Sequence, residues 1–191
     1  MNTGYIEDQL FDGTDFKVSP LKKGEYEGCR FHHCDFSGSD LSEITFTDCA
    51  FADCNLSLTK LTKTAFRDTS FKNCKMLGLH FEDCTAFGLS FNFDNCILNH
   101  SSFYNIKIKK TTFGNSQLQE VDFTDCDLSA SRFDNCDLTR ATFDNTLLEK
   151  ADFRTASNYS IDPERNRIRK AKFSLAGTRG LLDKYDIQID N

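Results

Sequence analysis

The sequence predicts an all-β solenoid, in which the chain turns every five residues and closes one coil every twenty. Three features predict it: large apolar residues recur at every fifth position, one column of them is purely phenylalanine, and a small residue stands two positions before most of them. A period of five fits neither a helix, with about 3.6 residues per turn, nor the alternation of a long strand. Internal repetition therefore decides the fold class.

The five-residue period runs through most of the chain with one interruption. It leads from Phe11 to Phe91, and after two inserted residues it resumes at Leu98 and continues to Phe153. The insertion predicts a break in phase near residues 92–95.

Every fourth large residue shows how many segments close a coil. With the insertion allowed for, this column is Phe11, Phe31, Phe51, Phe71, Phe91, Phe113, Phe133, Phe153 and Phe173. A column that stays aromatic at every twentieth residue implies four segments per coil, with rings stacked at the strand spacing and stabilised by offset stacking. The pattern yields about seven coils, a rod on the order of 35 Å long at about 4.8 Å per coil.

The cysteines occupy a second inward position. All nine stand two residues before a central residue of the five-residue pattern, which is large in every case except Ala86: Cys29, Cys34, Cys49, Cys54, Cys74, Cys84, Cys96, Cys126 and Cys136. Residues two apart along an extended segment point to the same side. We therefore expect small, buried, reduced thiols rather than disulfides.

The stretch CRFHHC suggests a zinc site, because it holds two cysteines and two histidines. The phase argues against this reading, since Cys29 and Cys34 point inward while His32 and His33 fall on outward positions. We predict no metal and no other cofactor.

Units such as CDFSG, SDLSE, CDLTR and ATFDN resemble the pentapeptide repeat family, whose consensus reads Ala-Asp/Asn-Leu-x-x. The resemblance covers residues 11–153, with NRIRK and AKFSL after them. It implies a right-handed quadrilateral β-helix with four pentapeptides per coil. Members that act on gyrase resemble B-DNA in shape and charge, and they dimerise through their C-termini. The long loops of quinolone-resistance members have no counterpart before residue 154.

The repeats predict a rod over residues 1–173 and a tail over 174–191. Within the rod, 154–165 should form an irregular coil or loop, because Pro163 takes a central position. The tail leaves the five-residue pattern. We expect it to hold a short helix after Gly180, to cap the rod and to offer a surface for a homodimer.

Composition and charge exclude several classes of function. A net charge of −6 argues against direct nucleic-acid binding. The chain has no apolar run of about 18 residues that would span a membrane, and its acidic N-terminus is unlike a secretory signal, so we expect a cytoplasmic protein. A coil filled with side chains leaves no interior pocket, which argues against an enzyme.

One predicted side stands out by its charge, the side that carries Phe81 and Phe123. Its outward positions hold five carboxylates and neither lysine nor arginine: Glu82, Asp83, Asp122, Asp125 and Asp144. A row of carboxylates on a rod suits a basic DNA-binding groove. The alternative is that Asp and Asn favour the corners between segments, where they cap turn amides.

A basic cluster precedes the tail: Arg165, Arg167, Arg169, Lys170 and Lys172. It is either a site for an anion or an acidic partner, or a solvated face beside the cap.

Two functional hypotheses follow from the sequence as a whole. The first is a non-catalytic scaffold for a protein partner that the sequence does not identify. The second is a DNA mimic that binds DNA gyrase, a type II topoisomerase, and inhibits it or protects it from quinolones.

Overall fold

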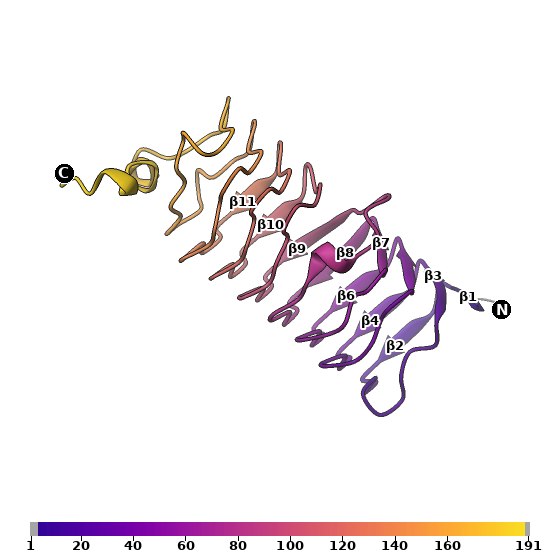
Figure 1. Ribbon diagram of the computed structural model, residues 1–191. Helices are drawn as coiled ribbons and strands as arrows, with labels where there is room; N and C mark the ends of the chain where they lie inside the picture. The colour runs from indigo at the N-terminus through magenta and orange to yellow at the C-terminus, as the bar shows by residue number, and fades with distance from the viewer. Residues whose placement is uncertain (1–3, 190–191) are drawn as a thin grey trace.

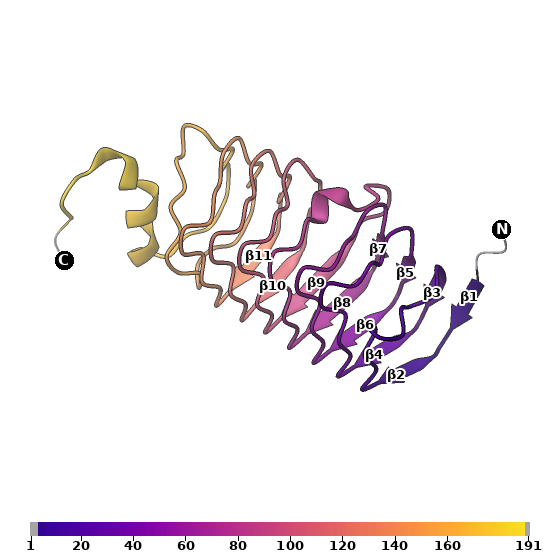
Figure 2. The same cartoon turned by 60° about the horizontal axis from the view of Figure 1, so that its bottom comes forward.

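The chain winds into a stack of four-sided coils in the computed structural model, which describes residues 4–189 (Figures 1 and 2). Every strand of these residues pairs in parallel with a strand one coil away. One sheet holds β1 (Gly4–Glu7), β3 (Gly24–Glu27), β5 (Thr45–Thr47) and β7 (Ala65–Arg67). The other holds β2 (Leu10–Asp12), β4 (Arg30–His32), β6 (Ala50–Ala52), β8 (Thr69–Lys72), β9 (Phe91–Asp94), β10 (Thr112–Gly114) and β11 (Arg132–Asp134). The predicted β-helix is confirmed.

The four sides of the rod are numbered in chain order. Side 1 carries the sheet of β1, β3, β5 and β7 and has Phe66 among its central residues, while side 2 carries the longer sheet and centres on residues such as Phe71. Sides 3 and 4 include Met76 and Phe81 as central residues, and their coils pair mostly through isolated parallel bridges. All four central residues are buried, so the core lies along the rod axis.

The predicted phenylalanine column stacks along side 2, with one correction. From Phe11 to Phe173 the ring centroids lie 4.6 to 5.4 Å apart. The ring that follows Phe71 belongs to Phe93, because β8 and β9 pair in the register Phe71↔Phe93. The assignment of Phe91 to this column is wrong.

The two inserted residues lie upstream of the expected break, in a loop at 84–90. Phe91 pairs with Thr69 at the start of side 2. Its buried ring turns toward the interior behind side 1, with its centroid 6.4 Å from that of Phe66. It fills the space that Ala86, which the loop carries to the surface, leaves empty.

The corners between the sides share a left-handed backbone. The residue two positions after most central residues has a positive φ, such as 56° at Asp53 and 50° at Asn115. Asp and Asn tolerate this conformation better than most residues, which explains their frequency there. The turn amides are capped from a different position: Asp35 precedes its central residue and accepts the Ser37 N–H at 2.8 Å.

The second inward position is a hydrogen-bond donor as well as a small residue. The Cys49 thiol donates to the carbonyl of the central residue one coil earlier, with sulfur and oxygen 3.3 Å apart. The Thr64 hydroxyl makes the same bond at 2.8 Å. All nine cysteines are buried and free, and burial raises the pKa of Cys49 and Cys136 to about 12. Both therefore keep the proton that they donate at neutral pH.

Short helices lie within and beyond the rod. A 3-10 turn, η1 (Phe81–Asp83), precedes the inserted loop, and η2 (Ala176–Leu181) and η3 (Asp183–Tyr185) follow the last coil (Figure 1). The short helix predicted after Gly180 is η3, and the structure adds η2, which begins before that residue. The outermost parts of the predicted rod and tail, residues 1–3 and 190–191, lie outside the described residues. None of these helices is long and apolar enough to cross a membrane, within the part of the chain that is described.

Truncation of one stacked ring should destabilise the rod far more than truncation of its outward neighbour. We expect Phe71→Ala to lower the free energy of unfolding by about 3–5 kcal/mol, because it leaves a cavity between two coils. Lys72→Ala should change it by less than about 0.5 kcal/mol. Urea titrations of both variants measure this difference, and equal effects would contradict the inward phase.

Removal of an inward hydroxyl should also be costly. We expect Thr64→Val to lower the free energy of unfolding by about 1 kcal/mol, because the carbonyl one coil earlier loses a buried donor. The exposed Thr62 provides the matched control, since Thr62→Val removes a hydroxyl that faces water. Equal denaturation midpoints for the two variants would rule out a stabilising role for the inward bond.

Candidate functional site

The five candidate carboxylates gather on side 4 and its corner with side 1. Glu82 and Asp83 belong to η1, Asp122 and Asp144 flank central phenylalanines, and Asp125 lies at a left-handed corner with φ 57°. They spread over four successive coils, about 15 Å of the rod axis at the strand spacing. The structure therefore brings all five to the region where the sequence placed them.

Two of these carboxylates also serve the local structure. Asp122 accepts the Thr124 N–H at 2.8 Å, as a turn cap. Asp125 accepts a hydrogen bond from the Asn145 side chain one coil later. Turn chemistry thus accounts for part of the acidic pattern.

Glu82 and Asp144 differ from the others in their partners. One oxygen of Glu82 lies 2.9 Å from a ring nitrogen of His80, while the other is buried and has no partner among residues 4–189. Asp144 forms an ion pair with Arg165. Among the five carboxylates, this is the one such pair with lysine or arginine in the described chain. Side 4 therefore keeps a net negative surface between Lys60 and Arg165.

The basic cluster of the sequence does not form one patch. Arg165 lies at the corner of side 4, Arg167 and Arg169 point outward on side 1, Lys170 lies at the next corner, and Lys172 is on side 2. Arg165 pairs with a carboxylate of the acidic side, and Lys172 lies 3.7 Å from Asp152. The last coil thus spreads these cations around the rod.

No zinc-like cluster forms around CRFHHC. Cys29 and Cys34 are buried, whereas His33 is exposed and hydrogen-bonds with Asp12 at 3.0 Å, which raises the pKa of His33. Residues 4–189 contain no group of three or more His, Cys, Asp or Glu side chains arranged to hold a metal ion.

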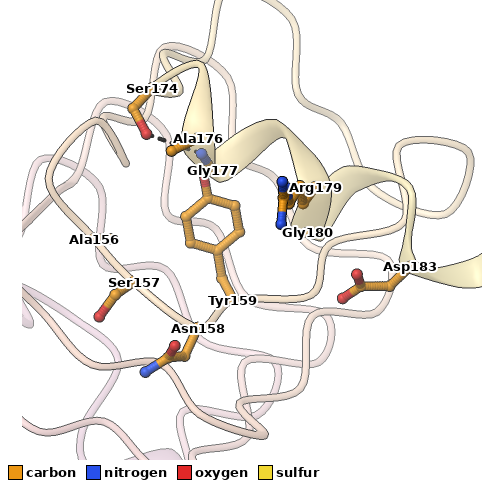
Figure 3. Close-up of a pocket in the computed structure, with 10 residues that line it drawn as sticks. All are labelled: Ala156, Ser157, Asn158, Tyr159, Ser174, Ala176, Gly177, Arg179, Gly180 and Asp183. Carbon is orange, nitrogen blue, oxygen red and sulfur yellow. Dashed lines mark hydrogen bonds between the residues drawn. The ribbon is translucent and has the colours of Figure 1, made fainter. Parts of the chain in front are cut away.

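An open pocket of about 390 Å³ separates the last coil from η2 (Figure 3). The buried Tyr159 ring lies at its centre, and its hydroxyl has no partner in the described chain. A β-carbon at Gly177 would come within 2.0 Å of the Tyr159 hydroxyl, and one at Gly180 within 2.0 Å of the Tyr159 carbonyl. Both glycines are therefore needed for the helix to close on the rod. The pocket is a seam between cap and coil.

The sequence pattern did not single out two residues that the structure makes prominent, Tyr159 and the side 3 carboxylate Asp137. The oxygens of Asp137 accept four hydrogen bonds: two from Thr139 and one each from Gln119 and Asn158. The signal was available in the spacing, since Gln119 and Asn158 lie about one coil before and after it. Burial alone would raise the pKa of Asp137, but these hydrogen bonds outweigh it and lower the pKa to about 2.

Acid should weaken the fold through this carboxylate. Because its folded pKa lies below the usual 3.8, its contribution to stability is complete above pH 4 and is lost as the pH falls toward 2. We expect Asp137→Asn, which keeps the turn-capping oxygen but has no charge, to show a smaller drop in denaturation midpoint between pH 7 and pH 2.5 than the wild type. An equal fall of the denaturation midpoint in both proteins would show that the acid sensitivity comes from groups other than Asp137.

Comparisons with known proteins place these features in a family. The model of the pentapeptide repeat region matches residues 25–92 and 89–153. The solved structure of a trypsin-treated form of QnrB1, a plasmid-mediated fluoroquinolone resistance protein, is 15% identical and covers 99% of this chain and 100% of its own, with a TM-score of 0.64. Full-length QnrB1 is 16% identical and covers 96% and 100%, with a TM-score of 0.52.

At these identities the structural likeness shows the fold alone, and no curated protein matches the chain. The family model, in contrast, covers well over half of the sequence. The chain belongs to the pentapeptide repeat family.

Proposed function

We propose that this chain is a non-catalytic binding protein that engages a protein partner through the outer sides of its rod. The carrying observation is the filled interior: rings and small side chains occupy the axis, so polar chemistry faces outward. All nine thiols are buried and free, and burial raises the pKa of Cys49 and Cys136 to about 12, so these two lack the thiolate that a nucleophile needs. Among the residues that line the seam beside Tyr159, Asp183 is the one carboxylate, and none is a histidine or a cysteine.

Side 4 favours a more specific function, the binding of DNA gyrase by mimicry of DNA. Glu82, Asp83, Asp122 and Asp125 form no ion pair with lysine or arginine in residues 4–189, so their charge is available to a basic groove. Duplex DNA carries one charge per about 1.7 Å, which gives about nine charges over 15 Å. That length is the span of these four carboxylates together with Asp144. The side therefore has about half the charge density of DNA, and we expect binding to be salt-sensitive.

The tail is the proposed surface for a homodimer joined end to end. Leu175, Tyr185 and Ile187 are large apolar residues that remain more than half exposed at the C-terminal end of the rod. Such a cluster beyond the last coil is better covered by a second copy than by water.

A supercoiling assay with purified gyrase tests the DNA-mimic function. We expect the protein at low micromolar concentration to inhibit supercoiling or to protect gyrase from a fluoroquinolone. The combined variant Asp122→Asn, Asp125→Lys and Asp144→Asn should lose this effect, because it removes the negative surface while the amide oxygen introduced at position 122 can still cap the turn.

The matched control is Asp12→Lys with Asp53→Lys, which changes the net charge by the same amount on side 2 and its following corner, away from side 4. It should keep the effect. Equal activity of the two charge variants would exclude the acidic-side mechanism. No effect of wild-type protein, shown to be folded by circular dichroism, would leave the scaffold function with a different partner.

A further inference from the structure

The charge of side 1 changes sign halfway along the rod. The first four coils expose carboxylates on this side and its following corner: Glu7, Asp8, Glu25, Glu27, Asp48 and Asp68. The last four coils expose cations there: Lys107, Lys110, Lys150, Arg167, Arg169 and Lys170. The stacking joins two basic segments that lie far apart in the sequence, since parallel bridges connect Lys107 with Arg167 through two intervening coils.

These charges are not neutralised within the chain. In residues 4–189 none of the twelve takes part in an ion pair, although Glu27 and Asp68 each accept a hydrogen bond. Each half holds an exception. Arg67 lies in the acidic half, beneath Gly88 of the inserted loop. The basic half holds the half-buried Glu149 and also Asp127, which pairs with Lys109 at 3.1 Å.

The sign changes at the inserted loop, which presents an apolar tip. Phe87 is 83% exposed and projects from side 1 at the fifth coil. The coils lie symmetrically about it. Four central residues precede the loop on this side (Ile6, Tyr26, Phe46 and Phe66) and four follow it (Ile108, Leu128, Leu148 and Ile168).

A two-fold rotation about an axis through this loop places a second copy so that its basic half faces the acidic half of the first copy, and its acidic half faces the basic half. It places the first of the nine levels on side 1, at Ile6, opposite the last, at Ile168, so that Glu7 and Asp8 face Arg167, Arg169 and Lys170. It also places the fourth coil opposite the sixth, where Asp68 faces Lys107 and Lys110. The same patch then serves both partners, as a two-fold interface requires.

We propose that side 1 is the contact surface for a second copy of this chain, packed side by side and antiparallel about an axis near Phe87. A polyanion such as nucleic acid would be attracted by the basic half and repelled by the acidic half, and a basic partner would meet the reverse. A second copy in this orientation satisfies both halves at once.

The contact should be weak and sensitive to salt. Side 1 offers a strip of about 40 Å by 10 Å, so the pair buries on the order of 800 Å² in total, the size of a transient encounter. Exposed charges are screened beyond about 10 Å at 0.1 M salt. This lateral contact is separate from the tail surface, because rods joined by their tails hold their Phe87 residues far apart.

Cysteine cross-linking tests the geometry directly. Phe87→Cys adds one exposed thiol to a chain whose nine native thiols are buried. In about 50 mM salt, where screening is weak, we expect it to form a disulfide-linked dimer at least about tenfold faster than Leu58→Cys. Leu58 is 71% exposed but lies at the corner of sides 3 and 4. About 500 mM salt should remove the difference.

Charge swaps in the Phe87→Cys background identify the contacting halves. Glu7→Lys with Glu25→Lys removes most of the negative charge of the acidic half, and Lys150→Glu with Arg169→Glu removes most of the positive charge of the basic half. Each variant alone should lose the rapid cross-link, and an equimolar mixture should restore it as a mixed dimer. Cross-linking at position 87 no faster than at position 58, or single variants that cross-link as fast as the unswapped protein, would overturn the proposal.

Discussion

The structure depends on the hydrogen bonds that join each coil to the next. The Phe36 N–H donates to the Asn55 carbonyl at 2.7 Å, and the Leu118 N–H makes the equivalent bond to Asp137 at 2.8 Å. A ladder of this kind holds each residue above its counterpart one coil earlier, so a regular coil contains twenty residues and the coil with the inserted loop has twenty-two. Like residues therefore become neighbours, and phenylalanine is stacked upon phenylalanine along side 2.

The same ladder explains why the sequence alone predicts so much of the fold. Position modulo twenty determines the side, and position modulo five determines whether a residue points inward, turns a corner or faces water. The nine thiols, the ring column and the acidic side were all predictable in this way. The left-handed corners add a backbone preference for Asp and Asn that a five-residue consensus cannot separate from capping.

The sequence could not predict the packing at the coil whose number of residues departs from twenty. Both Phe91 and Phe93 satisfy the spacing when the gap is moved by a few residues, and packing selects Phe93 because its ring stacks on that of Phe71. The partners of long charged side chains were equally inaccessible. The pair of Arg165 with Asp144 joins two clusters that have no evident relation in the sequence. The closure of η2 over Tyr159 lies outside the repeat altogether.

The loop at 84–90 has a further consequence, for how the rod folds. In a stacked array each coil contacts its neighbours alone, so order spreads from a nucleus coil by coil. The loop at 84–90 weakens the contact between its neighbouring coils, because the sheet of side 1 ends at β7 and fewer backbone hydrogen bonds cross this level. We therefore expect the rod to unfold as two cooperative units, which the rings of Phe81, Phe91 and Phe103 join across the loop. Unfolding that begins at an end coil should spread from coil to coil as far as the loop at 84–90 and pause there.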